Sequence, residues 1–114
     1  MELDRETFEA LVEQALDEIP DEIAALVHNV VVLVEDDAPP DDPGLLGVYD
    51  GVSLVERSSD HTGLPDRITI FRRPLLEMCV DEDELVREVR ITVVHEIAHH
   101  FGIDDARLHQ LGYG

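Results

Sequence analysis

The first part of the chain has a helical pattern of apolar positions. Apolar residues recur at intervals of three and four between Phe8 and Ile19, and mostly acidic residues occupy the positions between them. This periodicity predicts an amphipathic helix over residues 4–19, in which Asp4 is placed to cap the first turn. Pro20 interrupts the pattern, and a second, shorter helix is expected after it.

Several short segments in the middle of the chain have strand patterns. Val30–Val34 is an unbroken run of apolar, mostly β-branched residues, so we expect it to be buried on both faces at the centre of a sheet. An acidic, proline-rich loop follows over residues 35–44. Leu45–Tyr49 and Val52–Glu56 flank an Asp-Gly pair, which favours a hairpin. Arg67–Arg72 alternates in side-chain character and predicts a further strand.

The longest helical pattern lies near the C-terminal end. Asp81 and Glu84 have the spacing of a capping box, and an apolar stripe with helical spacing follows them. The stripe consists of Leu85, Val86, Val89, Val93, Val94, Ile97, Ala98 and Phe101. Gly102 comes where the pattern ends, and glycine readily takes the left-handed conformation that turns a chain back after a helix. Asp104 is placed to cap a final short helix over Asp105–Leu111.

The long helix carries the sequence His95-Glu96-Ile97-Ala98-His99. Each residue of an α-helix turns by about 100°, so positions four apart lie on the same face. The imidazoles of His95 and His99 can therefore reach one zinc ion. Glu96 points beside that ion, where its carboxylate can accept a proton from a metal-activated water. Two histidines and a neighbouring glutamate in this arrangement are typical of a metal-dependent hydrolase in which the glutamate is the general base.

A zinc ion held by two histidines needs a third protein ligand. No glutamate follows the second histidine, so the remaining candidates are His100, Asp104, Asp105 and His109. His100 lies well around the helix from the proposed metal face. A reversal of the chain at Gly102 would bring Asp104 or Asp105 toward the metal.

The full pattern, His95-Glu96-x-x-His99-x-x-Gly102-x-x-Asp105, resembles the extended zincin signature. In that signature the glycine makes a turn and the residue six positions after the second histidine is the third ligand, which implies Asp105 here. An aspartate in this position resembles the snapalysin type, and the short chain that ends soon after the motif resembles the minimal-zincin family of small bacterial metallopeptidases. The close match covers the motif segment, and a weaker likeness extends over Leu45–Val55 and Pro65–Leu76. Unlike the metzincins, the chain has no methionine after the motif to form a Met-turn.

The resemblance implies an α+β fold, in which a small mixed sheet of three to four strands packs against helices that include the long active-site helix. It also implies a zinc metallopeptidase that acts on a peptide or protein. One Zn²⁺ would be held by His95, His99 and Asp105, with Glu96 as general base for the attacking water. Tyr113 is a candidate for stabilising the oxyanion, and its alternative role is to pack the C-terminus. Two histidines and a carboxylate also suit Fe²⁺ or Mn²⁺.

By the same resemblance, Arg67–Arg72 is a candidate for the edge strand with which an extended substrate pairs. Arg67, Arg72 and Arg73 could then meet a substrate carboxylate. We favour the alternative that they pair with the protein's own surplus acidic residues, because surface ion pairs commonly have no functional meaning.

Composition narrows the remaining possibilities. With 114 residues, the chain is expected to form a single domain over 1–114. Its net charge of −19 repels nucleic acid and anionic membranes, so neither is an expected partner. The single cysteine, Cys79, excludes an intrachain disulfide. The sequence has no signal-peptide pattern and no apolar run long enough to span a bilayer, so we expect a cytoplasmic protein. The oligomeric state is left open.

Two other functions compete with peptide hydrolysis. The same ligands could hold a structural zinc ion in a non-catalytic protein. Alternatively, the acidic surface could bind a basic partner, for example as a mimic of nucleic acid. The second alternative does not explain the histidine motif and ranks last.

Overall fold

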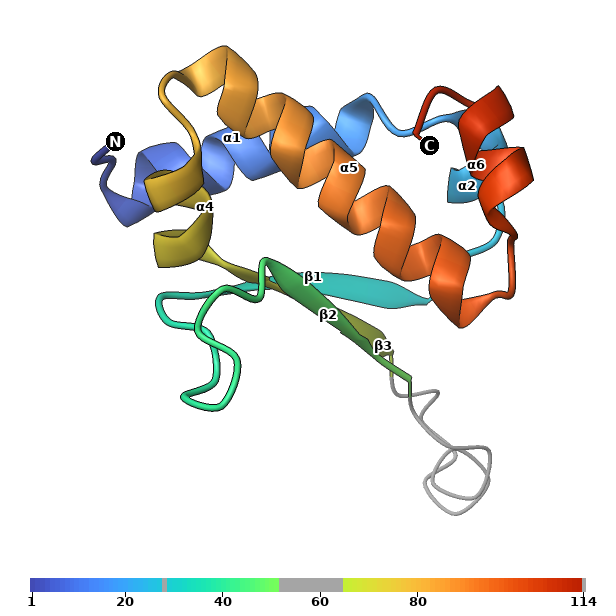
Figure 1. Ribbon diagram of the computed structural model, residues 1–114, viewed down its shortest axis with the longest axis horizontal. Helices are drawn as coiled ribbons and strands as arrows, with labels where there is room; N and C mark the ends of the chain where they lie inside the picture. The colour runs from blue at the N-terminus through green and yellow to red at the C-terminus, as the bar shows by residue number, and fades with distance from the viewer. Residues whose placement is uncertain (28, 52–64, 114) are drawn as a thin grey trace.

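Residues 1–27, 29–51 and 65–113 of the chain are described by a computed structural model. Within these ranges, helices cover one face of a small open sheet, so the fold is of the α+β class (Figure 1). The helices are α1 (Arg5–Asp17), α2 (Asp21–Ala24), α4 (Arg72–Met78), α5 (Glu82–His100) and α6 (Asp105–Gln110), and the strands are β1 (Val30–Glu35), β2 (Gly47–Asp50) and β3 (Asp66–Phe71). None of the helices in these ranges is long and apolar enough to cross a lipid bilayer.

The three strands are arranged in the order β1-β3-β2. β3 pairs in parallel with β1 and antiparallel with β2, so the central strand is β3. The expectation that Val30–Val34 is central was therefore wrong, as was the expectation that Arg67–Arg72 is an edge strand. β1 is an edge strand in which Val31 and Leu33 are 38% and 42% exposed on the sheet face that no helix covers. Partly buried and exposed positions alternate along β1. The sequence does not show this alternation, because the exposed positions Val31 and Leu33 are apolar like their neighbours.

The predicted hairpin is only partly within the described residues. Its first half corresponds to β2, which begins at Gly47 and extends through Asp50. Its second half, Val52–Glu56, lies outside the described residues.

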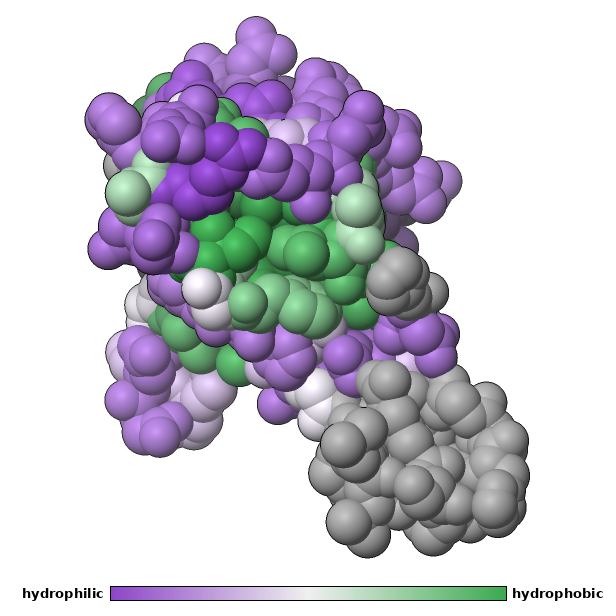
Figure 2. Space-filling model, turned by 90° about the vertical axis from the view of Figure 1, so that its right-hand side faces the viewer, coloured by the Kyte–Doolittle hydropathy of each residue, from purple (hydrophilic) through white to green (hydrophobic). Residues whose placement is uncertain are grey.

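The core lies between the helices and the sheet and is built around α5. α1 and α5 pack along each other, and both contribute buried residues to one apolar cluster. The predicted stripe of α5 is buried, except at Phe101, which is 42% exposed. Phe101 is the C-cap residue, so it follows the last helical turn, and its ring packs edge-on against His100 instead. Figure 2 shows the end of the molecule that carries α2 and α6, where apolar residues lie beneath a polar helical surface.

The helix starts follow the predicted capping signals. The carboxylate of Asp4 accepts a hydrogen bond from the backbone N–H of Thr7 at 2.8 Å, and Asp81 accepts one from Glu84 at the same distance. Glu84 reaches back to accept from the N–H of Val80 at 2.9 Å. The capping box is thus present with its return bond shifted by one residue, and both helices begin where their sequences indicate.

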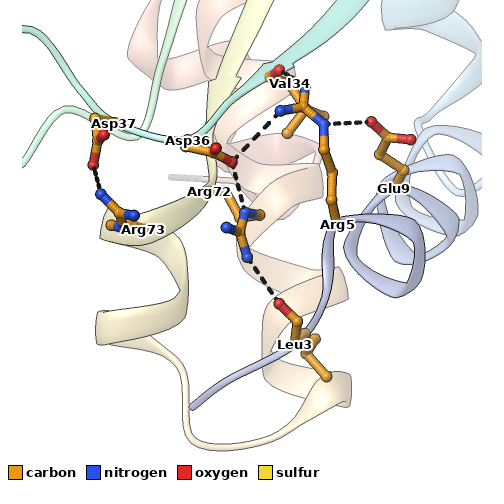
Figure 3. A network of polar contacts seen from close by, with 8 residues as sticks. All are labelled: Leu3, Arg5, Glu9, Val34, Asp36, Asp37, Arg72 and Arg73. Atoms are coloured by element: carbon orange, nitrogen blue, oxygen red, sulfur yellow. Dashed lines mark hydrogen bonds and ion pairs between the residues drawn. The ribbon is translucent and has the colours of Figure 1, made fainter.

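A polar network joins α1, β1 and α4 on one side of the molecule (Figure 3). Asp36 accepts from Arg72 Nε at 2.9 Å and also pairs with Arg5, while Arg73 pairs with Asp37. The preferred interpretation of Arg72 and Arg73, in which they pair with the protein's own acidic residues, is confirmed. The Arg72 guanidinium holds the pKa of the Asp36 carboxyl below its ordinary value of 3.8.

β2 lies unusually close to α5. A Cβ atom added to Gly47 would be 2.8 Å from the Cγ2 of Thr92 and 3.1 Å from the carbonyl oxygen of Thr69. No side chain fits between these atoms without displacement, so glycine is required for β2 to approach the helix this closely.

We expect Gly47→Ala to lower the free energy of unfolding by about 1–3 kcal/mol, because the added methyl group forces β2 away from α5. Urea unfolding of the purified protein measures this change. The double variant Gly47→Ala/Thr92→Ser lacks the obstructing methyl group and should recover part of the loss. Equal stability of wild-type and Gly47→Ala proteins would show that the contact is not tight.

We expect Asp36→Asn to lower the free energy of unfolding at neutral pH. The folded-state pKa of Asp36 is depressed, so its stabilising effect is present above pH 3.8 and is lost as the pH falls through the folded-state pKa. The difference between the two proteins should therefore shrink as the pH falls below 3.8, as followed by urea midpoints. Asp41→Asn, in the same loop, changes the same charge without touching the network and should show no such trend.

Candidate metal centre

α5 ends at His100, with Phe101 as its C-cap, and the chain turns at Gly102 as the sequence predicts. Gly102 has φ +73°. The N–H of Ile103 donates to the carbonyl of Ala98 at 2.8 Å, and the N–H of Gly102 donates to the carbonyl of His99 at 3.4 Å. These two bonds form a Schellman motif, which reverses the chain. The reversal carries the chain away from the end of α5 into α6.

The structure brings two of the predicted ligands together. The rings of His95 and His99 lie on the same face of α5, with centroids 5.9 Å apart and planes nearly perpendicular. Asp104 caps α6 by accepting from the N–H of Arg107 at 2.9 Å, so the capping role expected of Asp104 is confirmed. Asp105 is the exposed first residue of α6.

Asp105 is not placed with the two histidines. Across residues 1–27, 29–51 and 65–113, no group of three or more His, Cys, Asp or Glu side chains is positioned to hold a metal ion. Of the other candidate ligands, His100 stacks on Tyr49 with ring centroids 4.0 Å apart, and His109 is exposed on α6. His100 therefore points to other partners, as expected from its position on the helix.

A second glycine turn returns the chain to His95. Gly112 has φ +89°, and the N–H of Tyr113 donates to the carbonyl of Leu108 at 2.8 Å. The carbonyl oxygen of Tyr113 then lies 2.7 Å from Nε2 of His95. A carbonyl can only accept, so Nε2 is the donor in this contact, and in the neutral form of the ring the lone pair is on Nδ1. The Tyr113 side chain packs against the apolar core, and its ring centroid lies 6.0 Å from the guanidinium carbon of Arg90, which is a cation–π distance.

The carboxylate of Glu96 is held by the edge of the sheet. Its Oε1 accepts a hydrogen bond from the backbone N–H of Tyr49 in β2 at 3.1 Å. In the antiparallel pair, the carbonyl of Leu46 accepts from Phe71 in β3, so the alternate residues Gly47 and Tyr49 direct their backbone groups to the free edge. The proposed base is thus oriented by a backbone group of the strand beside it.

Tyr49 is fixed by contacts on two further sides. Its hydroxyl donates to Oδ2 of the buried Asp66 at 2.6 Å, and its ring stacks on His100 with an interplanar angle of 19°. Tyr49, Asp66 and His100 were not expected from the sequence to take part in this arrangement. The only available signal was an aromatic residue at the end of a predicted strand, which does not reveal a partner on another element.

A cleft of about 460 Å³ lies beside these groups. Residues 42 and 44–47 form one wall, and Ile91, Thr92, His95 and Glu96 of α5 form the other. The cleft therefore runs between the free edge of β2 and the helix that carries the motif. The cleft can therefore hold a segment of peptide chain next to the proposed base, Glu96.

The side chains of His95, His99 and Asp105 are of the types that bind zinc. Imidazole and carboxylate are common zinc ligands, and a metal-bound histidine usually donates its other ring N–H to a carbonyl or carboxylate. His95 has such a carbonyl partner in Tyr113, which leaves the lone pair of Nδ1 as a possible ligand. His99 is exposed at the protein surface, where solvent ions reach it.

Comparison with known proteins agrees with this chemistry. No curated protein matches the chain. Among solved structures, a conserved hypothetical protein from Thermo thermophilus is similar, with a TM-score of 0.58 and 24% identity over 87% of this chain and 94% of that one. Identity at this level supports the fold alone. The model of the zincin-like metallopeptidase family matches residues 27–114, and the chain therefore belongs to the zincin-like metallopeptidase family.

Proposed function

We propose that this protein is a zinc-dependent peptidase whose metal ligands are His95, His99 and Asp105 and whose general base is Glu96. The observation that supports this most is the placement of Glu96. Its carboxylate belongs to the histidine motif, faces the cleft, and is oriented by the Tyr49 N–H. Family membership supports the reaction class.

The residues of the chain would share the work as follows. Oε1 of Glu96 accepts a hydrogen bond from the Tyr49 N–H, so Oε2 remains to take a proton from the attacking water. A zinc ion held by His95, His99 and Asp105 would supply the positive charge that makes the water more acidic and the substrate carbonyl more electrophilic. Glu96 then delivers its proton to the leaving amine. The Tyr113 carbonyl orients the His95 ring.

The substrate would bind as an extended chain along the free edge of β2. Gly47 directs its N–H and C=O toward the cleft, and these groups can pair with a peptide backbone by β-strand addition. Such pairing would set the scissile carbonyl beside Glu96. We therefore propose β2, and not Arg67–Arg72, as the strand that pairs with the substrate, because β3 has a strand on each side.

Asp105 is proposed as the third ligand because its position in the motif fits the family spacing. Asp104 already serves as the N-cap of α6, which leaves Asp105 as the acidic residue available after the turn. For Asp105 to join the histidines, the turn at residues 102–104 must move α6 toward them.

We expect Glu96→Gln to retain bound zinc and to lose peptide hydrolysis by a factor of about 10²–10⁴, because the amide cannot accept the proton. Elemental analysis gives the zinc content, and cleavage of a peptide library, with and without chelator, gives the activity. Glu88→Gln makes the same change on the same helix away from the cleft and should leave both unchanged. Full activity of Glu96→Gln would exclude Glu96 as the base. Zinc binding without hydrolysis in the wild-type protein would indicate a structural metal.

We expect Asp105→Asn to weaken zinc binding by more than about 100-fold, because loss of a direct ligand should exceed the loss of an outer partner. Competition with a chromogenic chelator measures the affinity. Asp104→Asn is the matched control: asparagine caps a helix as well as aspartate does, so zinc affinity and stability should both be retained. The reverse pattern would assign the third ligand to Asp104.

A further inference from the structure

The sheet has a second free edge, on the side opposite the cleft. The carbonyl of Asn29 accepts from Asp66 in β3, whereas the carbonyl of Val34 accepts from the Arg5 side chain outside the sheet. Backbone direction alternates along a strand, so Val30, Val32 and Val34 direct their N–H and C=O groups away from β3. Within the described part of the chain, no strand pairs with β1 on this side.

A groove of about 590 Å³ runs along this edge. α1 forms its other wall, because α1 packs along α5 and leaves space between itself and β1. Val12 and Leu16 of α1 face Val30, Val32 and Val34 across the groove. The floor is therefore apolar and next to a row of backbone donors and acceptors.

The edge of β1 has few of the features that usually prevent an edge strand from pairing with another chain. Natural edge strands are commonly blunted by lysine, proline, bulges or a covering element. β1 has the sequence VVVLVE, and its only covering group within the described ranges is Arg5, at the Val34 end. Val31 and Leu33 continue the apolar surface onto the outer face of the sheet. Such an edge is well suited to pairing with another chain.

Charge decides which chain can pair there. Glu9, Glu13 and Glu35 line the groove. Among the described residues that line it, the one cation is Arg5, which already pairs with Glu9 and Asp36. Neither Glu13 nor Glu35 forms an ion pair with any residue that the structure describes. A second copy of this chain would bring another net charge of −19 to the contact, which opposes self-pairing.

We infer that the free edge of β1 is a docking site for an extended, basic segment of a partner protein. The segment adds a strand beside β1, with main-chain hydrogen bonds to Val30 and Val32. Its apolar side chains contact Val12 and Leu16, and its basic side chains lie on the opposite face of the sheet, beside Glu35. Glu13 on α1 adds to the negative charge of the groove. Because β3 and β2 separate β1 from the cleft, docking leaves the proposed catalytic residues accessible and does not depend on the peptidase function.

The test uses labelled peptides as long as β1 and fluorescence anisotropy with the full chain. A peptide that alternates lysine and valine should bind, and one that alternates glutamate and valine should not. The variant Glu13→Lys/Glu35→Lys should bind the basic peptide about tenfold more weakly. The control Glu77→Lys/Glu82→Lys has the same net charge but alters exposed acids outside the groove, and it should bind like the wild-type protein.

N-methylated peptides test the backbone pairing. Methylation of alternate amides removes the donors on one edge of the peptide only, so one of the two methylation frames should abolish binding and the other should retain it. Equal effects of the two frames, equal effects of the two double variants, or no binding of the basic peptide would each overturn the proposal. Concentration-dependent dimers in sedimentation that Glu13→Lys/Glu35→Lys alters would identify a second copy as the occupant and would also overturn it.

Discussion

The close approach of β2 to α5 is the constraint on which the site depends. Gly47 allows the strand to lie against Thr92, and two residues later the N–H of Tyr49 reaches the carboxylate of Glu96. The apolar stripe of α5 fixes the rotation of the helix, because its burial against α1 and the sheet leaves the histidine motif on the cleft side. A larger residue at position 47 would alter both the stability of the fold and the orientation of the proposed base.

Features set by neighbouring residues could be predicted from the sequence. The Asp4 and Asp81 caps, the turn at Gly102 and the apolar stripe of α5 each depend on side chains within a turn or two of one another. Placing His95 and His99 on one face also needs only helical periodicity. The sequence therefore identified the helix that carries the histidine motif and the position of the glutamate on it.

Features set by contacts between distant segments could not be predicted in the same way. A run such as Val30–Val34 suits both a central strand and an edge strand, since the difference depends on whether another element covers the outer face. The links from Tyr49 to Asp66 and Glu96 join three elements, and no local pattern indicates them. The position of Asp105 relative to the histidines likewise depends on how α6 packs after the turn.

The N-terminal helix, α1, belongs to the packed core although it lies outside the residues that the family model matches. The family model begins at residue 27, yet α1 lies before that point and buries Phe8, Val12 and Ala15 in the same core as α5. Without α1, one long side of the motif-bearing helix would face water. The part of the chain that the family model matches therefore does not coincide with the part that builds the packed core, and a fragment that began at residue 27 would lack a large part of its own interior wall.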